Sequence, residues 1–136
     1  MLRRRRVKPV FDVAPGATLD IADDAVLGDG CRFHVHAGAT VVVGAGTRLG
    51  EGCVVAAHER VEIGAGCRLA DSVTVMDFAP VDADPERPIR EQGLTTAPVR
   101  IGAGAILDRG ACVLAGTTIA PGARVTPHAV ASAGAA

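Results

Sequence analysis

The sequence predicts an all-β protein, a single-stranded parallel β-helix of about five to six triangular coils. Between Ile101 and Val125 an aliphatic residue occupies every sixth position, usually followed by glycine or another small residue. A six-residue period fits neither a helix nor a flat strand, and it is typical of a solenoid of short strands joined by tight turns. Three such hexads close one triangular coil.

The same phase recurs along most of the chain. Its positions are, coil by coil, Ile21, Leu27 and Phe33, then Val43, Leu49, Val55 and Val61, then Ile63, Leu69 and Val75, and finally Ile101, Leu107, Val113, Ile119 and Val125. The chain has 136 residues, of which 49% are hydrophobic and 21% charged, so we expect one soluble domain over residues 11–136. Its core is continuous only if the coils stack without gaps.

Residues 1–10 form a basic N-terminal tail that carries Arg3–Arg6. We expect this tail to be solvated, because four adjacent arginines without an apolar face anchor weakly to a membrane or to phosphates. No apolar stretch follows it as a signal peptide requires, and no aliphatic run reaches the roughly 20 residues that cross a bilayer. We therefore expect a cytoplasmic protein that does not bind membranes.

The aromatic content argues against nucleic acid as a partner. The chain has no Trp, no Tyr and only 3 Phe, whereas recognition of single strands depends on aromatic platforms for the bases. The net charge of −1 points the same way.

The four cysteines have neither a close pair nor the Cys-x-x-Cys spacing of a metal site. Cys31, Cys53 and Cys67 each follow a hexad position by four residues, so we expect small buried side chains, with Cys31 and Cys53 stacked on successive coils. A cytosolic compartment would keep them reduced.

One long interruption separates the hexad position Val75 from the next one, Ile101. The excess is a loop over residues 78–99, with four prolines and a charged centre. Long loops without secondary structure are uncommon in compact domains and are usually functional.

Several segments resemble the hexapeptide-repeat O-acyltransferases of the maltose and galactoside acetyltransferase type. The resembling segments are the hexad run from Ile101 to Val130, Val61-Glu62-Ile63-Gly64, Val75-Met76-Asp77, Pro98-Val99-Arg100-Ile101-Gly102, and Pro88-Ile89-Arg90-Glu91-Gln92-Gly93-Leu94. The hexads are shared by every hexapeptide protein; the placement of the long loop is more specific. The resemblance implies a left-handed β-helix and a cytoplasmic homotrimer that transfers an acyl group from acetyl-CoA or another acyl-CoA, as co-substrate, to a hydroxyl of a small acceptor in clefts between subunits.

In that family a histidine at the start of the long loop is the general base. Here the segment is Asp77-Phe78-Ala79-Pro80, and the histidine is missing. The family's Trp in the coil after the loop is replaced by Ile106. The resemblance implies that backbone amides and small side chains bind the acyl carrier, here at Gly110, Ala111, Pro127 and Ala129. Small residues at these positions are equally required by the tight turns.

His58 and Asp77 are the candidate replacements for the missing base. Coil counting places His36, His58 and Phe78 in one column along one corner, and His58 also matches a family position that contacts the acceptor. Asp77 aligns with the family's acidic residue beside the base. The alternatives are a solvated corner histidine and a turn aspartate that caps its own backbone.

Other candidate contacts are weaker. Arg87 and Arg90 could close over a neighbouring cleft as substrate contacts, but charged loop tips are usually solvated. His34 and His36 do not reproduce the three-histidine zinc motif of the γ-class carbonic anhydrases, so we expect no metal.

Two functions therefore remain open. The first is an acyltransferase-like enzyme with a surrogate base. The second is a catalytically lost or repurposed trimer, acting as a scaffold, a partner subunit or a CoA-independent enzyme. We expect a homotrimer in either case, because Val41-Val42-Val43 and Val54-Val55 leave partly apolar sides that threefold packing would cover.

Overall fold

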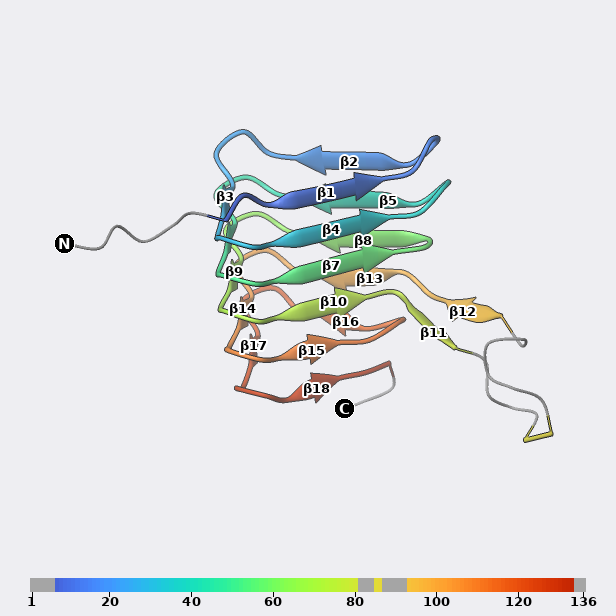
Figure 1. Ribbon diagram of the computed structural model, residues 1–136. Helices are drawn as coiled ribbons and strands as arrows, with labels where there is room; N and C mark the ends of the chain where they lie inside the picture. Colours follow the sequence, from blue (N-terminus) through green and yellow to red (C-terminus); the bar gives the residue numbers. More distant parts are fainter. Residues whose placement is uncertain (1–6, 81–84, 87–92, 134–136) are drawn as a thin grey trace.

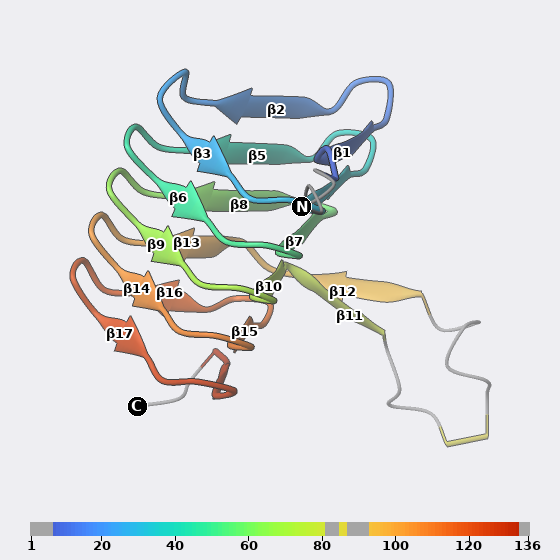
Figure 2. The ribbon, with the colours of Figure 1, turned by 60° about the vertical axis from the view of Figure 1, so that its left-hand side comes forward.

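The computed structural model describes residues 7–80, 85–86 and 93–133, and its described elements are all β-strands. The chain winds as a parallel β-solenoid of about five turns, with three sheets as the sides of a triangular prism (Figures 1 and 2). The structure therefore confirms the predicted fold, an all-β protein built as a parallel β-helix of short strands. Over the described residues no helix has the length and apolar character needed to cross a membrane.

Each turn of the solenoid contributes one strand to each sheet. Sheet A contains β1 (Val10–Val13), β4 (Arg32–Val35), β7 (Val54–Ala57), β10 (Thr74–Met76), β15 (Cys112–Val113) and β18 (Val130–Ala131). Sheet B contains β2 (Thr18–Ile21), β5 (Thr40–Val43), β8 (Arg60–Ile63), β13 (Val99–Ile101) and β16 (Thr118–Ile119). Sheet C contains β3 (Val26–Leu27), β6 (Arg48–Leu49), β9 (Arg68–Leu69), β14 (Ile106–Leu107) and β17 (Arg124–Val125).

The register of the strands follows the hexad phase. Ile21 pairs with Val43, and Ile63 pairs with both Val43 and Ile101 across the long interruption. The hexad positions from Phe33 to Ile119 are all buried, and they belong to one continuous hydrophobic core inside the prism. This core exists because parallel strands stacked in register place like side chains directly above one another.

The expectation that Val41-Val42-Val43 and Val54-Val55 form apolar outer sides is wrong for Val41, Val43 and Val55. These three side chains are at most 2% exposed and belong to the core. Successive side chains of a strand point to opposite faces, so only Val42 and Val54 remain on the outside.

The small residues at the corners permit this stacking. A Cβ on Gly64 would lie 2.7 Å from the backbone nitrogen of Ala103 in the next coil, closer than van der Waals contact allows.

Cys31, Cys53 and Cys67 are buried as predicted. Cys31 and Cys53 interact on adjacent coils, and the hydrogen bond from Cys53 lowers the pKa of the Cys31 thiol to about 7 while the same contact raises the pKa of Cys53.

The long interruption is an arm that leaves the prism at one corner. Its base is an antiparallel hairpin of β11 (Phe78–Pro80) and β12 (Leu94–Thr96), which projects away from the stacked coils (Figures 1 and 2). The chain returns to sheet B in β13. Near the N-terminus, strand β1 begins at Val10, which is the last residue of the predicted tail. Arg3–Arg6 lies outside the described residues.

Candidate functional site

Three rings stack along the corner between sheets A and B, where the arm departs. The imidazoles of His36 and His58 have centroids 3.6 Å apart and planes inclined by 13°. The Phe78 ring meets His58 edge-on at a centroid distance of 4.4 Å. The predicted column is therefore confirmed, with His36 exposed and the other two rings half-buried.

The coil register explains why these rings meet. His36 follows the end of β4 and His58 follows the end of β7, and these strands pair directly in sheet A. Phe78 lies beyond the end of β10, the next strand of the same sheet. Parallel strands all end at the same edge, so the residues that follow them stack about 4.8 Å apart.

Asp77 holds this corner together from inside. Its side chain is completely buried, and Oδ1 accepts the backbone N–H of His58 at 2.8 Å. Oδ2 accepts the N–H groups of Glu59 and Arg60, each at 2.7 Å. The Asp77 carbonyl also accepts the N–H of Ala97 at the base of the arm. Asp77 thus clamps the turn of the preceding coil rather than capping its own backbone.

The surroundings of His58 favour its neutral form. Burial lowers the pKa of His58 most, and the neighbouring His36 lowers it further, while Asp77 acts in the opposite direction. A neutral imidazole has one unprotonated ring nitrogen that can accept a proton, as a general base must.

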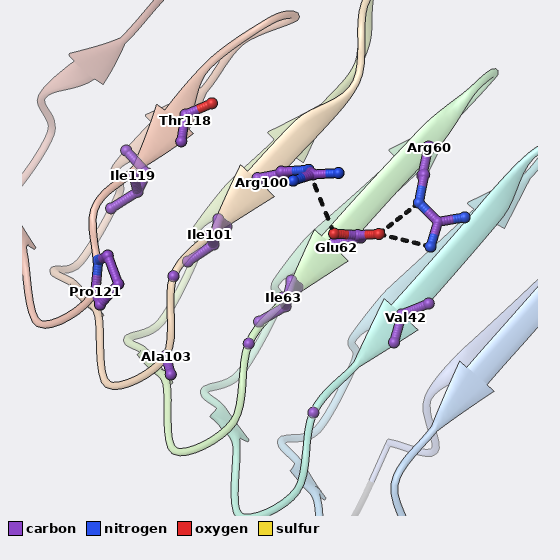
Figure 3. Close-up of a pocket in the computed structure, with 13 residues that line it drawn as sticks. Val42, Arg60, Glu62, Ile63, Arg100, Ile101, Ala103, Thr118, Ile119 and Pro121 are labelled. Atoms are coloured by element: carbon purple, nitrogen blue, oxygen red, sulfur yellow. Dashed lines mark hydrogen bonds and ion pairs between the residues drawn. The ribbon is translucent and has the colours of Figure 1, made fainter.

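An open groove of about 530 Å³ runs along the outer face of sheet B (Figure 3), and one of the residues that line it, Arg60, follows His58 by two residues in the sequence. Glu62 lies between two guanidinium groups: Arg60 contacts one of its carboxylate oxygens at 2.5 Å, and Arg100 contacts the other at 3.5 Å. Val42 and Pro121 add apolar surface. The sequence reasoning missed this groove, although Glu62 and Arg100 are register partners that coil counting across the arm would have aligned.

The predicted carrier residues lie at the opposite edge of sheet A. Gly110 and Ala111 directly precede β15, and Pro127 and Ala129 precede β18. Ala111 is buried, whereas Pro127 is exposed, and a Cβ on Gly110 would collide with the ring of His128. Because all strands of sheet A are parallel, one strand length, roughly 13 Å for four residues, separates this edge from the His58 corner in one chain.

Within the described residues, the remaining candidates add no contact to the His58 corner. Arg87 and Arg90 lie outside the described residues. His34 contacts Asp12 at 3.4 Å on the outer face of sheet A. Among the side chains that the structure describes, no three His, Cys, Asp or Glu gather as ligands of a metal ion.

Comparison with known proteins gives a relative in sequence and structures that share the fold. No model of a protein family matches the chain. The chain is 33% identical over 114 residues to a protein of Mycobacterium tuberculosis named a probable acetyltransferase, and the match covers 84% of the chain and 38% of that protein. The chain thus spans well under half the length of this relative.

Two solved structures have the same fold. The N-terminal domain of CcmM, solved in complex with CcmN, superimposes with a TM-score of 0.70 at 20% identity, over 93% of the chain and 99% of that domain. AntD, an N-acyltransferase from Bacillus cereus solved with dTDP and 3-hydroxybutyryl-CoA, gives a TM-score of 0.53 at 12% identity, over 90% of the chain and 74% of AntD.

Proposed function

We propose that this chain, whose repeat, solenoid and acetyltransferase relative fit the hexapeptide-repeat acyltransferases, transfers an acyl group from an acyl-CoA to a hydroxyl of a small acceptor. The observation that carries the proposal is the corner at which a neutral histidine, His58, lies between two rings beside the departing arm. The arm begins in the family with a histidine that this chain lacks, and His58 lies in the adjacent coil.

His58 acts as the general base in this proposal. Its free ring nitrogen takes the proton of the acceptor hydroxyl, and the oxygen then attacks the carbonyl carbon of the thioester. The new C–O bond forms, the C–S bond breaks, and the proton passes from His58 to the departing thiolate. The acceptor ends as an ester and the carrier as free CoA.

Asp77 acts as a positioning residue. Both of its carboxylate oxygens already accept backbone N–H groups, so its contribution to the reaction is to fix the turn that carries His58. His36 and Phe78 enclose the His58 ring and line the acceptor site. Arg87 and Arg90 remain predicted contacts of the arm.

A homotrimer would complete the site. The His58 corner and the carrier residues flank opposite edges of sheet A, so one chain alone keeps them apart. Threefold packing through the outer face of sheet A would bring the His58 corner of one copy to the Gly110 edge of the next. Val54, Ala56 and Met76 form an apolar patch among the outward residues of β7 and β10, next to the polar Thr74, and this patch supports burial of this face.

The groove on sheet B supports a polar acceptor. It is lined by the Arg60–Glu62–Arg100 network, and Arg60 follows the proposed base by two residues in the sequence. Groups that donate or accept hydrogen bonds would find partners there, while Val42 and Pro121 would contact the acceptor's apolar parts.

The test is release of free thiol from acetyl-CoA in the presence of a panel of sugars and other small alcohols. We expect release that depends on one class of acceptor and that falls at least 100-fold in His58→Gln. Asp20→Asn, which changes an exposed side chain of β2 outside the groove and outside sheet A, serves as the control and should retain activity. Equal activity in His58→Gln and the control would exclude His58 as the base.

A further inference from the structure

The outer face of sheet C carries a column of side chains, one from each strand. In register order the column is Val26, Arg48, Arg68, Ile106 and Arg124. Arg48 and Arg68 are therefore direct neighbours on adjacent strands, about 4.8 Å apart along the stack.

These two arginines differ from the other arginines of the sheet faces B and C. Arg124 pairs with Asp108 at 2.8 Å, and Arg60 and Arg100 share the carboxylate of Glu62. Within the described parts of the chain, neither Arg48 nor Arg68 has an ion pair or a side-chain hydrogen bond. Two like charges in register repel each other, and an anion placed between them would relieve that repulsion.

The surface at this point is hollowed. An open groove of about 450 Å³ is lined by both arginines and by the turn backbone at Gly50 and Ala70. Val26 and Ile106 form its apolar ends, and Asp108 is already occupied by Arg124. The groove therefore presents two uncompensated guanidinium groups between two apolar side chains.

We propose that Arg48 and Arg68 bind a phosphate group of a small phosphorylated ligand. A guanidinium presents its N–H donors as a planar fork that matches two phosphate oxygens, and two forks one strand apart can bind one phosphate or a diphosphate together. The apolar ends then contact the rest of the ligand.

The shape of the patch favours a small ligand over a polyanion. The positive run ends at Val26 on one side and at Ile106 on the other, so only two strands contribute uncompensated charge. Nucleic acids bind through several phosphate contacts at once, and an acidic peptide would likewise need a longer basic stripe.

This site is independent of the proposed acyl transfer. It lies on sheet C, whereas the His58 corner joins sheets A and B. Loss of acyl transfer in a His58 variant would leave it unaffected, and its own failure would leave the acyl-transfer proposal standing.

The test is calorimetric titration of the whole protein with inorganic pyrophosphate and with inorganic phosphate. We expect saturable binding, weakened about tenfold or more in both Arg48→Gln and Arg68→Gln, because each change removes charge-assisted hydrogen bonds. Arg109→Gln removes an exposed arginine from a turn outside the groove and should bind like the parent protein. Added sodium chloride should weaken binding.

Three outcomes would overturn the proposal. One is that neither pyrophosphate nor phosphate binds to the parent protein. Another is equal binding in Arg48→Gln, Arg68→Gln and Arg109→Gln. The third is binding of an acidic peptide, such as oligoglutamate, by a protein that ignores pyrophosphate, since the patch would then be a protein-docking surface.

Discussion

The imidazoles of His36 and His58 stack face to face on adjacent coils, with centroids 3.6 Å apart. This contact has an electrostatic consequence, because two imidazolium rings at that distance would repel strongly. His36 thereby adds to the effect of burial in lowering the pKa of His58. The stack keeps His58 neutral at pH values where an ordinary histidine begins to take up a proton.

Removal of His36 should shift the acid limb of activity. A histidine has an ordinary pKa of 6.5 and that of His58 is lower, so kcat/KM should stay high as the pH falls to this value and decline only below it. In His36→Gln the repulsion is gone, the pKa of His58 rises, and the acid limb moves to higher pH. A pH profile of kcat/KM for the parent protein and for His36→Gln measures the two acid limbs. An acid limb at the same pH in both proteins would contradict the electrostatic coupling between His36 and His58.

The same pKa shift predicts how stability depends on pH. Folding lowers the pKa of His58, so the unfolded chain binds more protons than the folded chain at mildly acidic pH. The free energy of unfolding should therefore decrease as the pH falls through 6.5, and His58→Gln should reduce this dependence. Urea denaturation at a series of pH values provides the measurement, and a decrease of equal size in the variant would count against the assignment.

Asp77→Ala should destabilise the fold severely. The substitution leaves three backbone N–H groups at the corner without their acceptor, since Asp77 accepts those of His58, Glu59 and Arg60. We expect the free energy of unfolding to fall by about 3 kcal/mol or more, and by less in Asp77→Asn, which keeps one oxygen. Denaturant unfolding tests this, and a loss below about 1 kcal/mol in Asp77→Ala would refute the clamp.

Phe33 and Phe11 form a matched pair for the core. They stack at 5.5 Å in adjacent coils, but Phe33 is fully buried whereas Phe11, in the first strand, is 49% exposed. Phe33→Ala should lower the free energy of unfolding by about 3–5 kcal/mol, and Phe11→Ala by much less. Similar losses in both variants, measured by guanidinium denaturation, would mean that the first coil is covered in solution.

Val54 and Val42 test which face forms the oligomer. Both valines are half-buried and point outward, Val54 from sheet A and Val42 from sheet B. Under the proposed packing, Val54→Glu places a charge in the interface and should give monomers, whereas Val42→Glu should keep the trimer. Size-exclusion chromatography with light scattering decides between them; a parent protein that is itself a monomer would remove the shared cleft.

Much of the fold could be predicted from the sequence because its repeat is one-dimensional. Once Ile63 and Ile101 are recognised as the same position in successive coils, the register on both sides of the arm follows. The same counting brought His36, His58 and Phe78 into one column. Here the backbone alone dictates which side chains meet.

Other features depend on side-chain directions that the repeat does not encode. The carboxylate of Asp77 turns into the prism and reaches the amides of the previous coil, which neither the turn interpretation nor the alignment with a catalytic acid anticipated. The register pairs Glu62 with Arg100, but the ion pairs in the groove depend on how the Arg60 and Arg100 side chains turn toward that carboxylate. The alternation of Val41 and Val42 between core and surface cannot be read from the sequence, because a run of valines has no hydrophobic period.

The most direct test of the central claim is calorimetric titration of the parent protein and of Val54→Glu with acetyl-CoA and with CoA. If a cleft between subunits binds the acyl carrier, the parent protein should bind both ligands in the micromolar range, and the Val54→Glu monomer should bind neither. Absence of binding by a trimeric parent protein would contradict acyl transfer from CoA at this site.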